Sequence, residues 1–124
     1  MQVTSVGSNN PSFGYSHPLK TLFKKGKLPT VTKGFYGGEL TKDTVSLEHL
    51  QPHSQGGRTI LENLVFATKK NNNARSDLPI LGFVNIEHIK EYLKQFQGVK
   101  VGILDGDLYI KLIKRTLKKM GVEL

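Results

Sequence analysis

Apolar residues recur at helical spacing near both ends of the chain. Leu19, Leu22 and Phe23 fit one face of a short helix that begins after Pro18. Toward the other end, Asn85 can cap a helix that stops at Gly98, and a last helix is predicted over residues 107 to 120. The apolar positions that share a face in these two helices are Ile86, Ile89, Leu93 and Phe96, and Leu108, Leu112, Ile113, Leu117 and Met120.

The middle of the chain follows a different pattern. Apolar and polar side chains alternate over residues 45 to 50, which predicts a strand, and residues 61 to 67 predict a second strand. Gly56-Gly57 supplies the backbone freedom for a turn between them. Thr68 can cap a short helix over residues 69 to 75 that ends before Pro79. The predicted order is strand, loop, strand, helix.

These patterns divide the 124 residues into three regions of one small α+β domain. Residues 1–33 form a basic N-terminal arm with a short helix, and residues 6–16 favour an extended segment. Residues 34–80 hold the strand–strand–helix unit. Residues 81–124 supply amphipathic helices that pack on it.

Charge adds a preference for a polyanionic partner. The net charge is +8, and residues 1–33 contain five lysines and no acidic residue. The segment from Lys111 onward contains five basic residues and one acidic residue, Glu123. Such an excess favours DNA through neutralised phosphates, although a merely solvated basic face is about equally consistent with charge alone. The chain has no cysteine, which excludes disulfides and thiolate zinc sites but leaves the redox compartment undecided. It has no apolar run long enough for a membrane span and no apolar signal segment at its N-terminus, so we expect an intracellular, cytoplasmic protein without a membrane partner.

The strand–strand–helix unit carries the candidate chemistry. Glu48 and His49 are neighbours on the first predicted strand, so their side chains start toward opposite faces. A helix that packs back over the hairpin brings Asn72, one turn in, toward Glu48. A carboxylate and an amide oxygen suit Mg²⁺, and an imidazole can accept a proton near neutral pH. Together they suit hydrolysis of a phosphodiester bond.

The segments LEHLQPHSQGG and NLVFATKKNNNARSD match a known pattern of residues. An acidic residue and a His are followed by Pro52, Ser54, Gly56-Gly57 and Asn63-Leu64, and then by a helix that carries Asn72. This arrangement resembles the HNH endonuclease family, and in particular the HNH domain of the RNA-guided CRISPR nucleases. The resemblance covers roughly residues 34 to 79 and implies a ββα-metal finger, with a metal-dependent endonuclease as the activity.

The resemblance implies a role for each matching residue. Glu48, where the family often has Asp, and Asn72 would bind Mg²⁺, Mn²⁺ or another divalent ion. His49 would be the general base, and Asn63 would bridge the loop and hold the backbone that orients His49. Asn71 and Asn73 are alternatives to Asn72. The basic residues that we expect to hold DNA phosphates are Arg58, Lys69, Lys70 and Arg75.

One departure from the family concerns structural zinc. Many members carry two Cys-x-x-Cys pairs, which would fall here at Gly34, Gly37, Thr68 and Asn71. None is cysteine, so the resemblance implies no structural zinc, and packing must hold the finger. We expect the two C-terminal helices and the cluster of Leu19 to Phe23 to take over that role.

Three functions stay open from the sequence. The first is a small endonuclease that cleaves DNA and leaves 3′-hydroxyl and 5′-phosphate ends, of the kind carried by phages and mobile elements. The second is a catalytically inactive nucleic-acid-binding module with an HNH fold, in which Glu48 and His49 are simply an exposed polar pair. The third is an interaction protein whose basic helix contacts an acidic protein.

Overall fold

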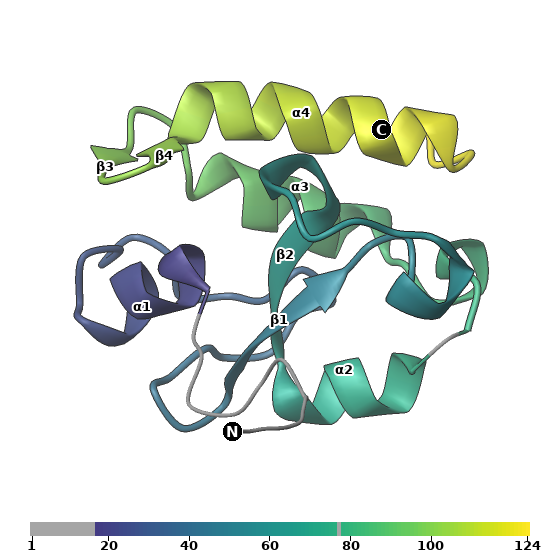
Figure 1. Cartoon of the computed structure of the whole chain (residues 1–124), viewed down its shortest axis with the longest axis horizontal. Helices are drawn as coiled ribbons and strands as arrows, with labels where there is room; N and C mark the ends of the chain where they lie inside the picture. Colours follow the sequence, from purple (N-terminus) through teal and green to yellow (C-terminus); the bar gives the residue numbers. More distant parts are fainter. Residues whose placement is uncertain (1–16, 77) are drawn as a thin grey trace, which may run out of the picture.

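The computed structural model describes residues 17–76 and 78–124 and has an α+β fold (Figure 1). The described part contains four α-helices and two small antiparallel sheets. The elements are α1 (Pro18–Lys24), β1 (Val45–His49), β2 (Leu64–Thr68), α2 (Lys69–Arg75), α3 (Ile86–Lys94), β3 (Lys100–Val101), β4 (Leu104–Asp105) and α4 (Gly106–Lys119).

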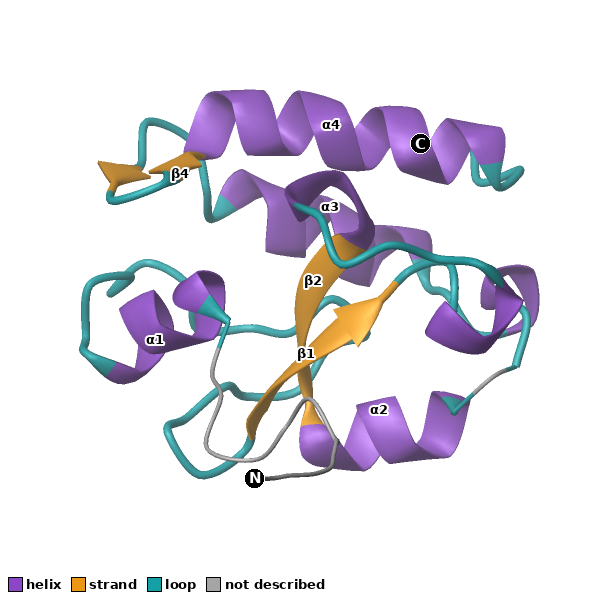
Figure 2. Ribbon diagram, in the orientation of Figure 1, coloured by secondary structure: helices purple, strands orange, loops and turns teal. Residues whose placement is uncertain are grey.

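The predicted strand–strand–helix order is confirmed. β1 and β2 pair antiparallel, with Val45 opposite Thr68 and His49 opposite Leu64, and α2 follows β2 directly (Figure 2). The Thr68 hydroxyl caps α2 by accepting a hydrogen bond from the Asn71 N–H at 3.1 Å, as predicted. The second strand begins three residues later than expected, because residues 61 to 63 close a 3₁₀ turn in which the Asn63 N–H donates to the Ile60 carbonyl.

Within the described residues, the sheet of β1 and β2 has no third strand at the outer edge of β2. Tyrosines of α3 and α4 form hydrogen bonds with backbone groups at that edge instead. The Phe66 N–H donates to the Tyr92 hydroxyl at 2.9 Å, and the Tyr109 hydroxyl donates to the Leu64 carbonyl at 2.7 Å. The two hydroxyls are 2.8 Å apart, so Tyr92 donates to Tyr109 and the chain of bonds is complete. Buried backbone groups without partners are costly, and these side chains replace a missing strand.

The two C-terminal helices form as predicted, with one correction to the buried face. Asn85 caps α3 through its side chain, as expected, and the Asp105 carboxylate caps α4. The buried stripe of α4 contains Tyr109, Ile113 and Leu117, whereas Leu108 is 52% exposed. The prediction for Leu108 was wrong because the inward face of α4 starts one residue later, at the tyrosine that reaches β2.

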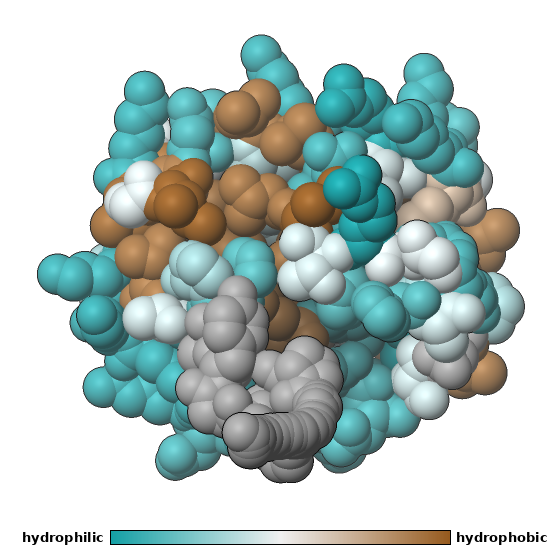
Figure 3. Space-filling model, in the orientation of Figure 1, coloured by the Kyte–Doolittle hydropathy of each residue, from teal (hydrophilic) through white to brown (hydrophobic). Residues whose placement is uncertain are grey.

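The hairpin is packed between α2 on one side and α3 and α4 on the other, and α1 closes one end (Figure 1). Phe66 contacts Phe23, which belongs to the predicted apolar face of α1, and also contacts Phe96, just beyond α3. Figure 3 shows hydrophilic residues along the outer edge of α4 and apolar residues near the β3–β4 hairpin. The predicted extended segment of residues 6–16 lies outside the described residues. Within those residues, no helix combines the length and hydropathy needed to cross a bilayer.

We predict that Tyr92→Phe destabilises the fold. The substitution keeps the ring but leaves the buried Phe66 N–H without an acceptor, which costs about 1–3 kcal/mol. Urea unfolding followed by circular dichroism measures this loss. An unchanged midpoint would show that the tyrosine hydroxyls do not support the edge of β2.

Candidate functional site

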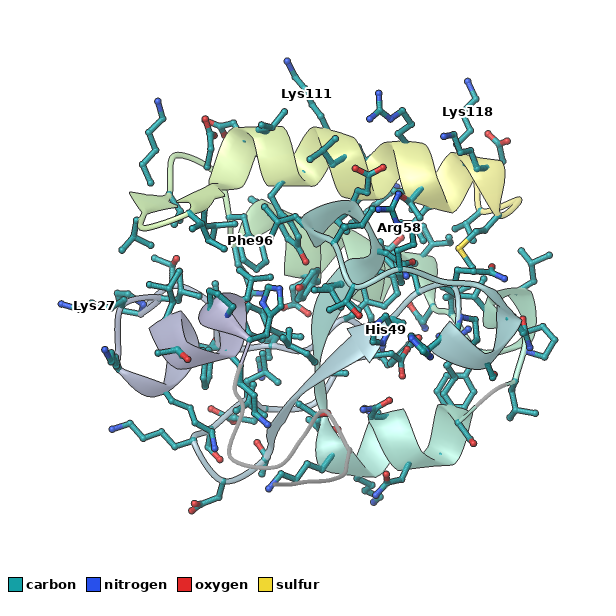
Figure 4. All side chains as sticks on the ribbon, viewed as in Figure 1. Lys27, His49, Arg58, Phe96, Lys111 and Lys118 are labelled. Carbon is teal, nitrogen blue, oxygen red and sulfur yellow. The ribbon has the colours of Figure 1, made fainter. Side chains whose placement is uncertain are left out.

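A cavity of about 350 Å³ opens where β1 ends beside α2. Its lining brings together Glu48, His49 and Asn72, the three residues predicted to share a site. Figure 4 shows His49 at the tip of the β1 arrow, with Arg58 between it and α4. The rest of the lining consists of Leu47, Pro52, His53, Ser54, Asn73 and Ser76.

Glu48 is buried beneath this cavity and is paired with Arg75. Its Oε2 accepts a hydrogen bond from Arg75 Nη1 at 3.0 Å and a second one from the Tyr36 hydroxyl. The same hydroxyl accepts from Arg75 Nη1 at 3.3 Å. Residues from the segment before β1, from β1 itself and from α2 therefore meet at one carboxylate oxygen.

Arg75 uses its guanidinium inside the fold, and its predicted role as a phosphate-binding residue is wrong. Its side chain is 1% exposed. In addition to Glu48, it donates to the carbonyls of His49, Leu50 and Leu78, each at 2.9 Å. A guanidinium presents five N–H donors in a planar fork, which suits this many buried acceptors. Arg75 thus fastens the end of α2 to the end of β1.

The other oxygen of Glu48, Oε1, is also buried but has no hydrogen-bond partner among the described residues. Burial raises the pKa of the Glu48 carboxyl, and the hydrogen bonds from Tyr36 and Arg75 oppose that shift. Two donors thus fix one oxygen, while the other is buried without a described hydrogen-bond partner on a residue that lines the cavity.

His49 is half-buried at the rim of the same cavity. Its Nε2 lies 2.9 Å from the Thr59 hydroxyl oxygen, and its ring centroid is 5.9 Å from that of His53. Its pKa lies below the ordinary value of 6.5, mainly because burial disfavours the imidazolium, with further contributions from His53 and His17. The neutral ring, which can accept a proton, is therefore favoured.

Asn63 joins the two ends of the loop that follows His49. Its Oδ1 accepts from the Gln51 N–H at 2.8 Å, and its Nδ2 donates to the carbonyls of Gln51 and Arg58 at 3.1 and 2.9 Å. The Asn63 carbonyl also accepts from the Leu50 N–H at 2.9 Å. Asn63 is buried and does not line the cavity, so it acts on His49 only through the backbone.

The three consecutive asparagines of α2 point in different directions. Asn71 donates from Nδ2 to the Gly37 carbonyl at 3.2 Å and does not line the cavity. Asn72 donates from Nδ2 to the Ser46 hydroxyl at 2.7 Å, which leaves its Oδ1 without a hydrogen bond to any described residue. Asn73 is exposed at the cavity wall. Asn72 and Asn73 thus remain as candidate ligands on α2, and Asn71 does not.

Three of the four predicted phosphate-binding residues are exposed: Arg58, Lys69 and Lys70. Lys69 and Lys70 begin α2. The pKa of Lys20 lies below its ordinary value, mainly because of partial burial and further because Lys24 and Lys69 are close to it. Lysines of α1 and α2 therefore share one surface, whose use by DNA stays a prediction.

The four positions where the family resemblance would place zinc cysteines come together in space. A Cβ placed on Gly34 would lie 3.4 Å from the Thr68 nitrogen, and the Asn71 amide donates to the Gly37 carbonyl. The Gly34 N–H donates to the Gly38 carbonyl at 3.0 Å. A hydrogen bond from Asn71 thus connects the segment of Gly34 and Gly37 to the segment of Thr68 and Asn71, and these four positions form one corner of the hairpin.

The role of Tyr36 and the burial of Arg75 were not predicted. A signal for Arg75 was present, because residues three apart on a helix share a face and Arg75 lies three residues after Asn72. Tyr36 carried no comparable signal. Within residues 17–76 and 78–124, no three His, Cys, Asp or Glu side chains gather as they would around a fully protein-ligated metal.

Comparisons with protein-family models, with curated proteins and with solved structures found no match. The cavity is therefore interpreted from its own residues and geometry.

We predict that Arg75→Gln strongly destabilises the protein. Removal of the guanidinium leaves the buried Glu48 carboxylate without its counter-charge, with Tyr36 as its only donor among the described residues, and leaves the carbonyls of His49 and Leu50 without the Arg75 donor, at a cost of about 3–5 kcal/mol. Lys70→Gln, which removes the same charge from an exposed position of α2, should change stability by less than about 0.5 kcal/mol. Urea unfolding of both variants is the measurement, and equal effects would contradict the structural role of Arg75.

We also predict the titration of His49 in the metal-free protein. Its NMR midpoint should lie below 6.5 and should move toward 6.5 in His53→Gln, whereas His88→Gln should leave it unchanged. Because the folded state binds fewer protons than the unfolded state between these values, this contribution to stability is complete above pH 6.5. It is lost as the pH falls from 6.5 through the folded pKa. A midpoint above 6.5 would contradict the assigned environment.

Proposed function

We propose that the protein is an HNH-type endonuclease that hydrolyses DNA phosphodiester bonds with one divalent metal ion and His49 as the general base. In this proposal β1, β2 and α2 form a ββα-metal finger. The observation that carries it is that Glu48, His49 and Asn72, distant by up to 24 positions in sequence, line one cavity. The spacing that resembles the HNH family supports the same reading.

The oxygens at the cavity fit Mg²⁺ or Mn²⁺. Among the described residues, Glu48 Oε1 is buried without a partner, and Asn72 Oδ1 has no hydrogen bond, since that amide bonds only through Nδ2 to Ser46. Mg²⁺ is commonly held by one or two protein oxygens together with water and substrate phosphate. The ion would neutralise the charge that develops on the phosphate during hydrolysis. Tyr36 and Arg75 both bind Oε2, so Oε1 is the oxygen of Glu48 that would bind the ion.

His49 would take the proton of the attacking water. When Nε2 carries the ring proton and donates to Thr59, Nδ1 presents its lone pair, and Nδ1 has no hydrogen bond to any described residue. The lowered pKa keeps the ring neutral at physiological pH. Water then attacks phosphorus, the bond to the 3′ oxygen breaks, and the products carry a 3′-hydroxyl and a 5′-phosphate.

Exposed basic residues would hold the DNA backbone around this cavity. Arg58, Lys69 and Lys70 are accessible, and Lys20 and Lys24 extend the surface of Lys69. Contacts to phosphate fix the position of the duplex but carry no sequence information. The rival function, a DNA-binding module without cleavage, needs these lysines but no chemistry at His49.

The deciding experiment is an assay on supercoiled plasmid with Mg²⁺ or Mn²⁺. Wild-type protein should relax or linearise the plasmid, and His49→Ala should lower the rate by about 10²–10⁴-fold because the general base is lost. His88→Ala, a histidine outside the cavity, is the matched control. Chelation of the metal should abolish cleavage by all variants.

The controls separate the possible outcomes. If wild type and His49→Ala both retard DNA and both leave it supercoiled, the protein is a binding module. If both cleave equally, His49 is not the base. Mn²⁺ binding measured by electron paramagnetic resonance tests the metal independently of activity: Asn72→Ala should weaken it and Asn71→Ala should not, whereas a loss only in Asn73→Ala would move the ligand to Asn73.

A further inference from the structure

A second and larger cavity, of about 610 Å³, lies between α3 and α4 and is separate from the candidate site. We call it the α3–α4 groove. Its lining comes from the two helices, from Gln97 just beyond α3 and from residues 122–124, and it shares no residue with the cavity at His49. In Figure 1, α3 lies behind the β1–β2 hairpin.

Four lysines rim the groove: Lys90 and Lys94 on α3, and Lys114 and Lys118 on α4. Each pair is one helical turn apart, and like charges at this spacing slightly destabilise a helix. All four are exposed, and within the described residues the only ion pair closer than 4.0 Å is that of Arg75 with Glu48. The rim therefore carries uncompensated positive charge, with Glu123 as the single acidic residue in the lining.

The floor of the groove is apolar. Leu93 and Val122 form its buried part, Ile110 is half-buried, and Leu124 is 43% exposed at its edge. No aromatic side chain occurs among the described lining residues. Single-stranded nucleic acid is usually held by aromatic stacking, and the backbone of a duplex requires no apolar floor. Charge and floor together favour a partner that is both acidic and apolar.

We propose that the α3–α4 groove binds an acidic amphipathic helix of a partner protein. Apolar side chains at helical spacing would cover the floor, and flanking carboxylates would face the four lysines. From Ile110 to Lys118 the groove follows α4 for about 12 Å, which is enough for two turns of a partner helix. This inference concerns a surface away from the candidate site and holds whether or not the protein cleaves DNA.

The test uses a fluorescein-labelled helical peptide of about 16 residues, with Leu at i, i+3, i+4, i+7 and i+11 and Glu on both flanks. Fluorescence anisotropy measures its binding to the full-length protein. The combined variant Lys90→Glu with Lys114→Glu should weaken binding by at least about tenfold. The matched control, Lys111→Glu with Lys119→Glu, makes the same charge change at exposed positions outside the groove and should weaken binding less than about twofold.

A second pair of variants tests the floor without changing charge. Leu124→Gln removes an exposed apolar contact at the edge of the groove and should weaken binding about threefold. Ile103→Gln, exposed but outside the groove, should have no effect. Thermal unfolding of each variant establishes that it is folded.

Three results would overturn the proposal. The first is equal weakening by the groove and control charge variants. The second is equal affinity for a peptide of the same composition in which the leucines do not share a face. The third is that the peptide does not bind, while a DNA duplex of about 20 base pairs binds and loses affinity in the groove variant alone, which would make the groove a nucleic-acid contact.

Discussion

The buried pair of Glu48 and Arg75 is the interaction on which the arrangement of the site depends. α2 is only seven residues long and cannot be stable by itself, so its position is set by what holds its ends. Thr68 caps its start, and Arg75 fastens its last turn to the carbonyls of His49 and Leu50. Because Asn72 is one turn before Arg75, the same bonds fix where Asn72 lies relative to Glu48.

Burying two charges is expensive, and the pair is tolerated because nearly every donor and acceptor of the two side chains has a partner. Arg75 contacts three backbone carbonyls in addition to Glu48, and Tyr36 bonds to both charged groups. Such a pair contributes less to net stability than to the choice of one arrangement, because a displaced α2 would leave both charges uncompensated. The orphan Oε1 of Glu48 is the exception, and it belongs to a residue that lines the cavity.

Hydrogen bonds also hold the hairpin in place, at one corner where the family resemblance would put a zinc site and at the edge of β2. Four positions that would carry zinc-binding cysteines under the family resemblance meet at one corner, where Asn71 and the backbone supply hydrogen bonds. On the opposite side, Tyr92 and Tyr109 satisfy the edge of β2. The expectation that the C-terminal helices support the hairpin therefore has a specific form in these two side chains, neither of which was among the predicted face positions of the two helices.

The sequence correctly predicted the helices, strands and caps that depend on local preference. It did not predict which side chains are buried where contacts between distant residues determine the burial. Strand alternation, the Thr68 and Asn85 caps and the turn at Gly56-Gly57 are local, and the elements they define are present. The burial of Arg75 could not be read from composition, because arginine is rarely buried unless it is paired, and its partner Glu48 is 27 positions away. Leu108 is exposed because the buried face of α4 begins one residue later, at Tyr109. That face is set by the hydrogen bond from Tyr109 to the Leu64 carbonyl, which is distant in sequence.

The charge balance at the cavity has a consequence for the proposed chemistry. Glu48 shares its negative charge with Arg75, so a divalent ion at Oε1 would meet a nearly neutral pair together with an uncharged amide. The affinity for metal alone should therefore be modest, because affinity for such ions grows with the number of charged ligands. In the proposed function, a DNA phosphate at the cavity would supply the missing negative charge. Metal and substrate would then strengthen each other's binding, and the buried pair would confine tight metal binding to the complex with DNA.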